Sequence, residues 1–121
     1  MTRILIIDDD LDILETVGAL LAAKGFEIYS VDTVEKGLEA IPRLSPNLIL
    51  LDVLFPEDSH LGFKTAGIIK KSYPGLPVFL FSAVNREYAF SLDGQRVEAD
   101  EFLVKPVNID RLVTLINQHA K

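Results

Sequence analysis

Short apolar runs alternate along the chain with stretches in which apolar residues recur every three or four positions. Five of the runs are rich in Ile, Leu, Val and Phe and show little polar alternation, as expected of strands covered on both faces. These predicted strands are Ile4–Ile7, Phe26–Val31, Leu48–Leu51, Val78–Phe81 and Phe102–Val104. Strands that alternate with helices in this way predict an α/β fold with a parallel sheet.

The intervening stretches predict helices. Ile13, Val17 and Leu20 share one face of a first helix, which ends at Gly25. Thr33 is expected to cap a second helix that runs to about Ile41. The other predicted helices are Gly62–Tyr73, Asn85–Leu92 and a last one that Asn108 caps and that contains Ile109, Leu112, Val113 and Ile116. Five strand–helix units in 121 residues predict a single domain over residues 1–121.

Polar residues follow the apolar strands at the points where the strands end. In chain order they are Asp8, Asp9 and Asp10, then Asp52, then Ser82, and finally Lys105. Asp32 follows the second strand and is expected to face solvent at the margin of the sheet. Ligands of open parallel sheets bind beyond the carboxyl ends of the strands, so these residues are the candidate site.

Several carboxylates at one edge of a sheet repel each other and resist ionising together. A hard cation relieves this repulsion, and oxygen ligands favour Mg²⁺. Asp52 is then both a metal ligand and a nucleophile for phosphorus. Lys105 supplies a positive charge, and the Ser82 hydroxyl can donate to a phosphoryl oxygen.

These residues resemble the receiver domain of bacterial two-component response regulators. The resemblance covers essentially the whole chain in order: Ile6-Ile7-Asp8-Asp9, Asp52 with Pro56 after it, Ser82-Ala83, and Phe102-Leu103-Val104-Lys105-Pro106. It implies a flavodoxin-like (βα)5 doubly wound sheet with strand order 2-1-3-4-5. It also implies a phosphorelay switch that catalyses only its own phosphorylation and dephosphorylation.

The resemblance assigns roles to single residues. Asp52 is the expected phosphorylation site, and Asp9 and Asp52 are expected to ligate Mg²⁺ directly. Asp8 is expected to act through water, and Leu54 through its backbone carbonyl. Ser82 and Lys105 are expected to contact the phosphoryl group, and Phe102 to be the switch aromatic, with a cis bond between Lys105 and Pro106.

The resemblance also implies partners. The expected phosphoryl donor is a histidine kinase or a histidine phosphotransfer protein. The face formed by the fourth helix, fifth strand and fifth helix is expected to bind an effector domain or a second copy of the chain.

The chain departs from the family pattern around Asp52. The glycine that family members place about eight residues after the acceptor is Gly62 here, ten residues after it, which indicates a two-residue insertion. Leu54 and Val84 are apolar, and Glu98 replaces a common glycine. We expect the two aliphatic side chains to hinder the water that hydrolyses phosphoaspartate, so that self-dephosphorylation is slow.

Composition excludes several other functions. The chain has no cysteine, which rules out disulfides and thiol chemistry. Its two histidines, His60 and His119, are too few for a histidine-rich metal site and are expected to be solvated. A net charge of −6 argues against direct binding of nucleic acid or an anionic membrane. Since no apolar run reaches the ~18 residues of a membrane span, a cytoplasmic location is expected.

Two alternative functions remain open from the sequence. One is a pseudo-receiver that binds partners without being phosphorylated. The other is a phosphohydrolase of the haloacid-dehalogenase type, in which Asp8 is the nucleophile and Asp10 the general acid. Such hydrolases normally have a larger chain with a cap and a further acidic pair after a later strand. Asp10 can also be the N-cap of the first helix.

Overall fold

The computed structural model describes residues 1–53, 61–82 and 99–120, in which five strands form one sheet. The strand order is β2-β1-β3-β4-β5, and every neighbouring pair is parallel. The strands are β1 (Arg3–Ile7), β2 (Glu27–Val31), β3 (Leu48–Asp52), β4 (Val78–Ser82) and β5 (Glu101–Val104). The predicted flavodoxin-like topology is therefore confirmed.

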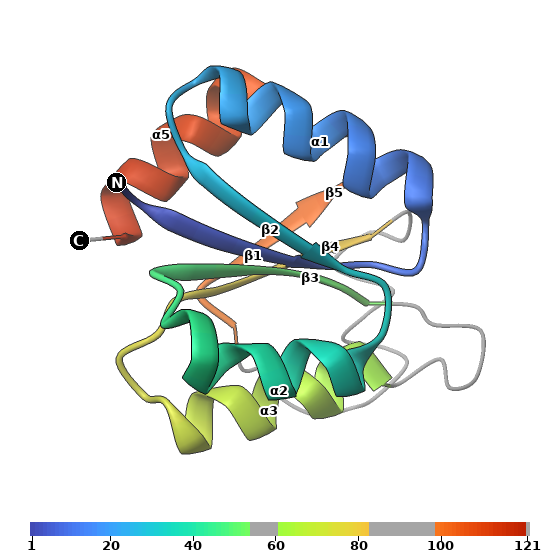
Figure 1. The fold of residues 1–121 in the computed structure, drawn as a ribbon, viewed down its shortest axis with the longest axis vertical. Helices are drawn as coiled ribbons and strands as arrows, with labels where there is room; N and C mark the ends of the chain where they lie inside the picture. Colours follow the sequence, from blue (N-terminus) through green and yellow to red (C-terminus); the bar gives the residue numbers. More distant parts are fainter. Residues whose placement is uncertain (54–60, 83–98, 121) are drawn as a thin grey trace.

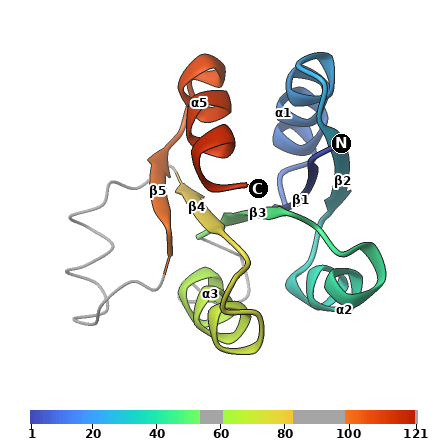
Figure 2. The ribbon, with the colours of Figure 1, turned by 90° about the vertical axis from the view of Figure 1, so that its left-hand side faces the viewer.

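Helices cover both faces of the sheet, as Figures 1 and 2 show. One face carries α1 (Leu11–Ala23) and α5 (Ile109–His119), and the other carries α2 (Val34–Leu44) and α3 (Leu61–Ser72). The helix predicted over 85–92 lies outside the described residues. Burial on both faces explains why the strands lack polar alternation.

Alternate residues of each strand enter two separate cores. Ile4 and Ile6 of β1 belong to the core beneath α1 and α5. Leu5 and Ile7 belong to the core on the side of α2 and α3. The side chains at the carboxyl ends of the strands are consequently held by a sheet that is packed from both sides.

Three side chains cap the helices as predicted. Asp10 accepts hydrogen bonds from the backbone N–H groups of Asp12 and Ile13, at 3.0 and 3.3 Å. Thr33 caps α2, and Asn108 caps α5. These oxygens satisfy N–H groups that have no partner within the first turn of a helix.

The predicted end of the second helix is wrong. The second helix continues past Pro42 to Leu44 and ends where Ser45 adopts the left-handed conformation, with φ 49°. Its buried residue Ile41 keeps this turn packed on the sheet, and the Ser45 N–H donates to the Ile41 carbonyl. In α1 the buried residues are Val17, Gly18 and Leu21, whereas Leu20 is 45% exposed.

Candidate functional site

The ends of three central strands bring polar side chains into an apolar environment. Asp8 follows β1 and is fully buried, while Asp52 ends β3 and is 4% exposed. Ser82 ends β4 and is 1% exposed. The parallel register pairs Asp52 with Phe81 and Ser82 with Val104, so these groups share one edge of the sheet.

The structure places three carboxylates close enough to share a cation. Asp8, Asp9 and Asp52 each offer an oxygen, and these oxygens lie within 4.8 Å of one another. Asp9 is exposed to solvent, whereas the other two are buried. Oxygen ligands that are partly open to water suit Mg²⁺, which keeps several of its waters when bound.

Both oxygens of Asp8 have hydrogen-bond donors. Its Oδ1 accepts from the backbone N–H of Asp10 at 2.9 Å. Its Oδ2 accepts from the ammonium group of Lys105 at 3.0 Å. Asp8 is thereby fixed between the start of α1 and the residue that follows β5.

Lys105 joins the first, third and fifth strands. Its Nζ also donates to Asp52 Oδ1 at 3.3 Å and lies 4.8 Å from the centre of the Phe81 ring. The backbone N–H of Lys105 donates to the Ser82 carbonyl at 2.8 Å, and the following bond to Pro106 is cis, as predicted. Its side chain is 18% exposed, so the ion pairs lie in a poorly solvated place.

Burial changes the acid–base properties of the cluster. Desolvation raises the pKa of Asp52 to about 7, helped by the charge of Asp8 and opposed by Lys105. Desolvation also raises the pKa of Asp8. Burial lowers the pKa of Lys105, but bonding to Asp8 and the charge of Asp52 outweigh it, so the pKa is raised and the ammonium form is retained.

Comparison with known proteins identifies the family. The family model for the response regulator receiver domain matches residues 4–117. The chain belongs to the response regulator receiver family. As a receiver domain, it is a signalling switch rather than a true enzyme.

Sequence relatives of this receiver domain are longer proteins. The response regulator FleR of Pseudomonas aeruginosa is 32% identical over 98% of this chain and 24% of its own length. The homologue of the transcriptional regulator CpxR in Haemophilus influenzae is 34% identical over 96% of this chain and 49% of its own length. The chain therefore spans about a quarter of the first relative's length and about half of the second's.

Solved structures share the fold of this receiver domain. A CheY-like receiver protein of Methanospirillum hungatei is 32% identical with a TM-score of 0.82, and the match covers 98% of this chain and 92% of that one. TrrA of Thermotoga maritima, in complex with Mg²⁺–BeF, is 30% identical with a TM-score of 0.84, and the match covers 98% of both chains.

Gly62 packs directly against the backbone of Asp52 and Val53. A Cβ atom at this glycine would lie 2.4 Å from the Asp52 carbonyl oxygen and 2.5 Å from Val53 Cα. The Gly62 N–H also donates to the Val53 carbonyl at 3.2 Å. The close approach that only glycine permits thus occurs ten residues after Asp52, at the residue that the sequence singled out.

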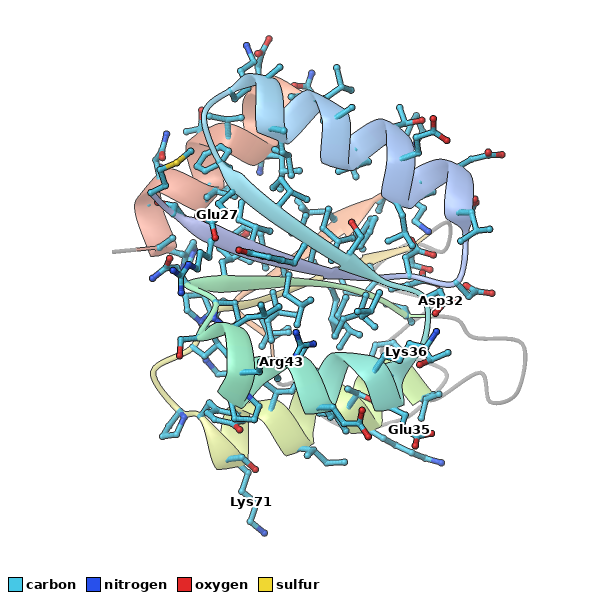
Figure 3. All side chains as sticks on the ribbon, viewed as in Figure 1. Glu27, Asp32, Glu35, Lys36, Arg43 and Lys71 are labelled. Carbon is cyan, nitrogen blue, oxygen red and sulfur yellow. The ribbon has the colours of Figure 1, made fainter. Side chains whose placement is uncertain are left out.

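The remaining candidates divide into three groups. Asp32 forms an ion pair of 2.9 Å with Lys36 (Figure 3) and is not one of the three carboxylates of the cluster. Phe102 is partly buried and packs against the core on the side of α2 and α3. Leu54, Val84 and Glu98 lie outside the described residues, so slow self-dephosphorylation stays a prediction.

Two described residues have roles that the sequence did not predict. Phe81 was expected only as a strand residue, but its ring lies beneath the Lys105 ammonium group. His119 was expected to be solvated, and this was wrong: its ring packs edge-on against Phe79 and its Nε2 lies 3.0 Å from Glu101. Among the described residues, no helix has both the length and the apolar character needed to span a membrane.

Proposed function

We propose that Asp52 is the residue that accepts the phosphoryl group, from a phosphohistidine of a histidine kinase or a phosphotransfer protein. Family membership implies a histidine kinase partner. The observation that carries the assignment to Asp52 is its contact with Lys105 at 3.3 Å, beside two further carboxylates at the same sheet edge. A cation placed next to the nucleophile attracts an anionic phosphoryl group and offsets the charge that develops during transfer.

The transfer is an exchange of one bond at phosphorus. An oxygen of the ionised Asp52 attacks phosphorus, forming a P–O bond, while the P–N bond to the donor imidazole breaks. The electron pair of the P–N bond stays on the imidazole nitrogen. Lys105 remains protonated throughout and donates hydrogen bonds to the phosphoryl oxygens, because its raised pKa keeps the ammonium form at neutral pH.

The carboxylate cluster suits Mg²⁺. Asp9 and Asp52 would hold the ion directly, Asp8 would act through water, and the Leu54 carbonyl, outside the described residues, would add a ligand. When bound, Mg²⁺ supplies positive charge that stabilises the transferring group. The complex of TrrA with Mg²⁺–BeF supports this proposal by similarity.

The proposed response to phosphorylation runs through Ser82 and Phe102. The Ser82 hydroxyl would donate to a phosphoryl oxygen, and the Phe102 ring would shift an existing equilibrium between inactive and active forms. We infer that the surface of β5 and α5, where Val104 is 46% exposed, then changes its preference for an effector or a second copy. Residues 1–121 as one domain and a cytoplasmic location stay predictions.

The geometry of Asp8 and Asp10 disfavours the phosphohydrolase. Asp8 is buried and both of its oxygens accept hydrogen bonds, so it is poorly placed to attack an incoming phosphate. Asp10 accepts two backbone hydrogen bonds as the N-cap of α1, which leaves it without the role of a general acid.

Intact-mass spectrometry with phosphoramidate tests the assignment. We expect the wild type to gain one phosphoryl group only when Mg²⁺ is present, and Asp52→Asn to gain none. An adduct that survives Asp52→Asn and disappears in Asp8→Asn would point to the hydrolase. Absence of any adduct in a folded wild type with bound Mg²⁺ would favour the pseudo-receiver.

A further inference from the structure

The ammonium group of Lys105 is held from three directions, and only two of them are carboxylates. Asp8 Oδ2 lies 3.0 Å away and Asp52 Oδ1 lies 3.3 Å away. The third neighbour is the Phe81 ring, whose centre is 4.8 Å from Nζ. A cation within about 6 Å of a ring centroid is attracted to the negative face of the aromatic system.

Phe81 is fixed more firmly than a side chain on a loop could be. It lies in β4 between β3 and β5, is 1% exposed, and its backbone carbonyl accepts the Val53 N–H at 3.3 Å. It belongs to the core beneath α1 and α5, so packed helices hold the ring from behind. The ring therefore offers Lys105 a surface that is itself packed into the core.

The contact differs in kind from the two ion pairs. The carboxylates attract Lys105 only while they are ionised, and both are expected to take part in metal or phosphoryl chemistry. An aromatic face keeps its charge distribution whatever those groups do. A leucine would fill much of the same volume but would present no negative face to the ammonium group.

We propose that Phe81 is a positioning residue of the phosphoryl site: its ring holds Lys105 Nζ at the carboxylate pair. This inference rests on the proposed function of Asp52. The positive charge of Lys105 is then in place before the phosphoryl group arrives. The lysine does not have to be reordered during transfer, which is how preorganised charge accelerates a reaction.

Phe79 provides a matched control. It lies two residues before Phe81 on the same strand, in the same core, and is likewise fully buried. Its ring contacts His119 instead of Lys105. Phe79→Leu and Phe81→Leu thus remove similar buried rings, and only the second removes the neighbour of the lysine.

The experiment compares the initial rate of Mg²⁺-dependent phosphorylation by phosphoramidate, measured by intact mass. We expect Phe81→Leu to be about 2-fold to about 30-fold slower than the wild type. Phe79→Leu should stay within about 2-fold, although both variants lose thermal stability. Trifluorophenylalanine at position 81 keeps the shape of the ring but weakens its negative face, so it should slow the reaction without a comparable loss of stability.

A second measurement observes the lysine directly. In ¹³C-labelled protein, the CεH₂ group of Lys105 should show an upfield ring-current shift that is lost in Phe81→Leu and kept in Phe79→Leu. Folded Phe81 variants that react at the wild-type rate would overturn the positioning role and leave the function of Asp52 intact. A wild type that takes no phosphoryl group would instead overturn the proposed function, while the ring-current shift still reports whether the ring holds the lysine.

Discussion

The residues at the end of β3 are tightly packed. Asp52 ends a strand whose five residues are all buried, and Gly62 lies directly against its backbone. Such a position leaves no room for a side chain at residue 62 and little water for the carboxylate. The tight packing favours fixed geometry over solvation of the charge.

Substitution of Gly62 tests this packing at the scale of one methyl group. Gly62→Ala places a Cβ 2.4 to 2.5 Å from backbone atoms of Asp52 and Val53, and backbone cannot rotate aside as a flexible side chain can. We expect unfolding in urea to show a loss of about 2–4 kcal/mol. Gly75→Ala is the control, because a Cβ there meets nothing within 4 Å. Equal stability of the two variants would contradict the packing.

The sequence predicted the charged residues of the site but not the contacts of Phe81 or of His119, which lies outside the site. Asp8, Asp52 and Lys105 stand out because charged groups seldom follow directly on buried apolar strands. Phe81 carries no such signal, since a phenylalanine in a strand is ordinary core. His119 could not be placed either: its contact with Glu101 depends on where α5 ends relative to β5, which pattern alone does not determine.

At the scale of elements, a lysine fastens the end of α3 to the strands beside it. Lys70 Nζ donates to the Leu76 carbonyl at 3.1 Å and to Asp100 Oδ2 at 3.0 Å. Asp100 also accepts the Val78 N–H at 2.8 Å. One cation thus joins α3, the loop into β4 and the residue before β5.

Removal of this cation should weaken the fold. Lys70→Met leaves Asp100 partly buried without its ion-pair partner, so we expect a loss of about 1–3 kcal/mol by chemical denaturation. Lys71→Met is the neighbouring control, since Lys71 is exposed and points away from the domain (Figure 3). It should change stability by less than about 0.5 kcal/mol. Similar values for the two variants would show that the Lys70 contacts contribute nothing.

The cap of α1 is a second test at this scale. Asp10→Ala removes the acceptor for two backbone N–H groups and should cost about 1 kcal/mol, whereas Asp10→Ser keeps a capping oxygen. Thermal unfolding measures the difference. Both variants should still be phosphorylated, because Asp10 is assigned to the helix and not to the chemistry. Loss of the adduct in Asp10→Ser would contradict that assignment.

Elements were predicted better than their ends. The five strands follow from apolar runs, and three caps follow from Asp10, Thr33 and Asn108. The end of α2 was missed by three residues, because Pro42 is a local signal to stop, while the packing of Ile41 is a tertiary contact. Tertiary contacts of this kind override local preference and leave no mark in the sequence nearby.

At the scale of the whole molecule, burial of the carboxylates lowers the stability of the folded protein, and a bound Mg²⁺ ion should restore it. The fold buries Asp8 and Asp52 against each other and supplies one lysine between them. The chain already carries a net charge of −6, so a further buried negative charge is opposed by the rest of the protein. Stability should therefore depend on pH and on Mg²⁺ in a linked way.

The sign of the pH dependence follows from Asp52. Its pKa is about 7 in the folded protein against a reference value of 3.8, so between these values the folded state holds a proton that the unfolded state has lost. Without Mg²⁺, the contribution of Asp52 to stability is fully present below about pH 4 and is lost as the pH rises from there through about 7. From pH 5 to pH 8 the wild type should lose about 2 kcal/mol relative to Asp52→Asn, which has no proton to release at this position. Thermal unfolding at both pH values measures this difference.

Mg²⁺ should reverse that loss at pH 8 and have little effect at pH 5, because the ion binds the ionised carboxylates of the folded state. A concentration of 100 times the dissociation constant stabilises the fold by about 2.7 kcal/mol. Asp52→Asn, which retains Asp8 and Asp9, should gain less from the same concentration. Parallel melting temperatures for the two proteins across pH, with and without Mg²⁺, would mean that Asp52 is not the buried charge that couples folding to the metal.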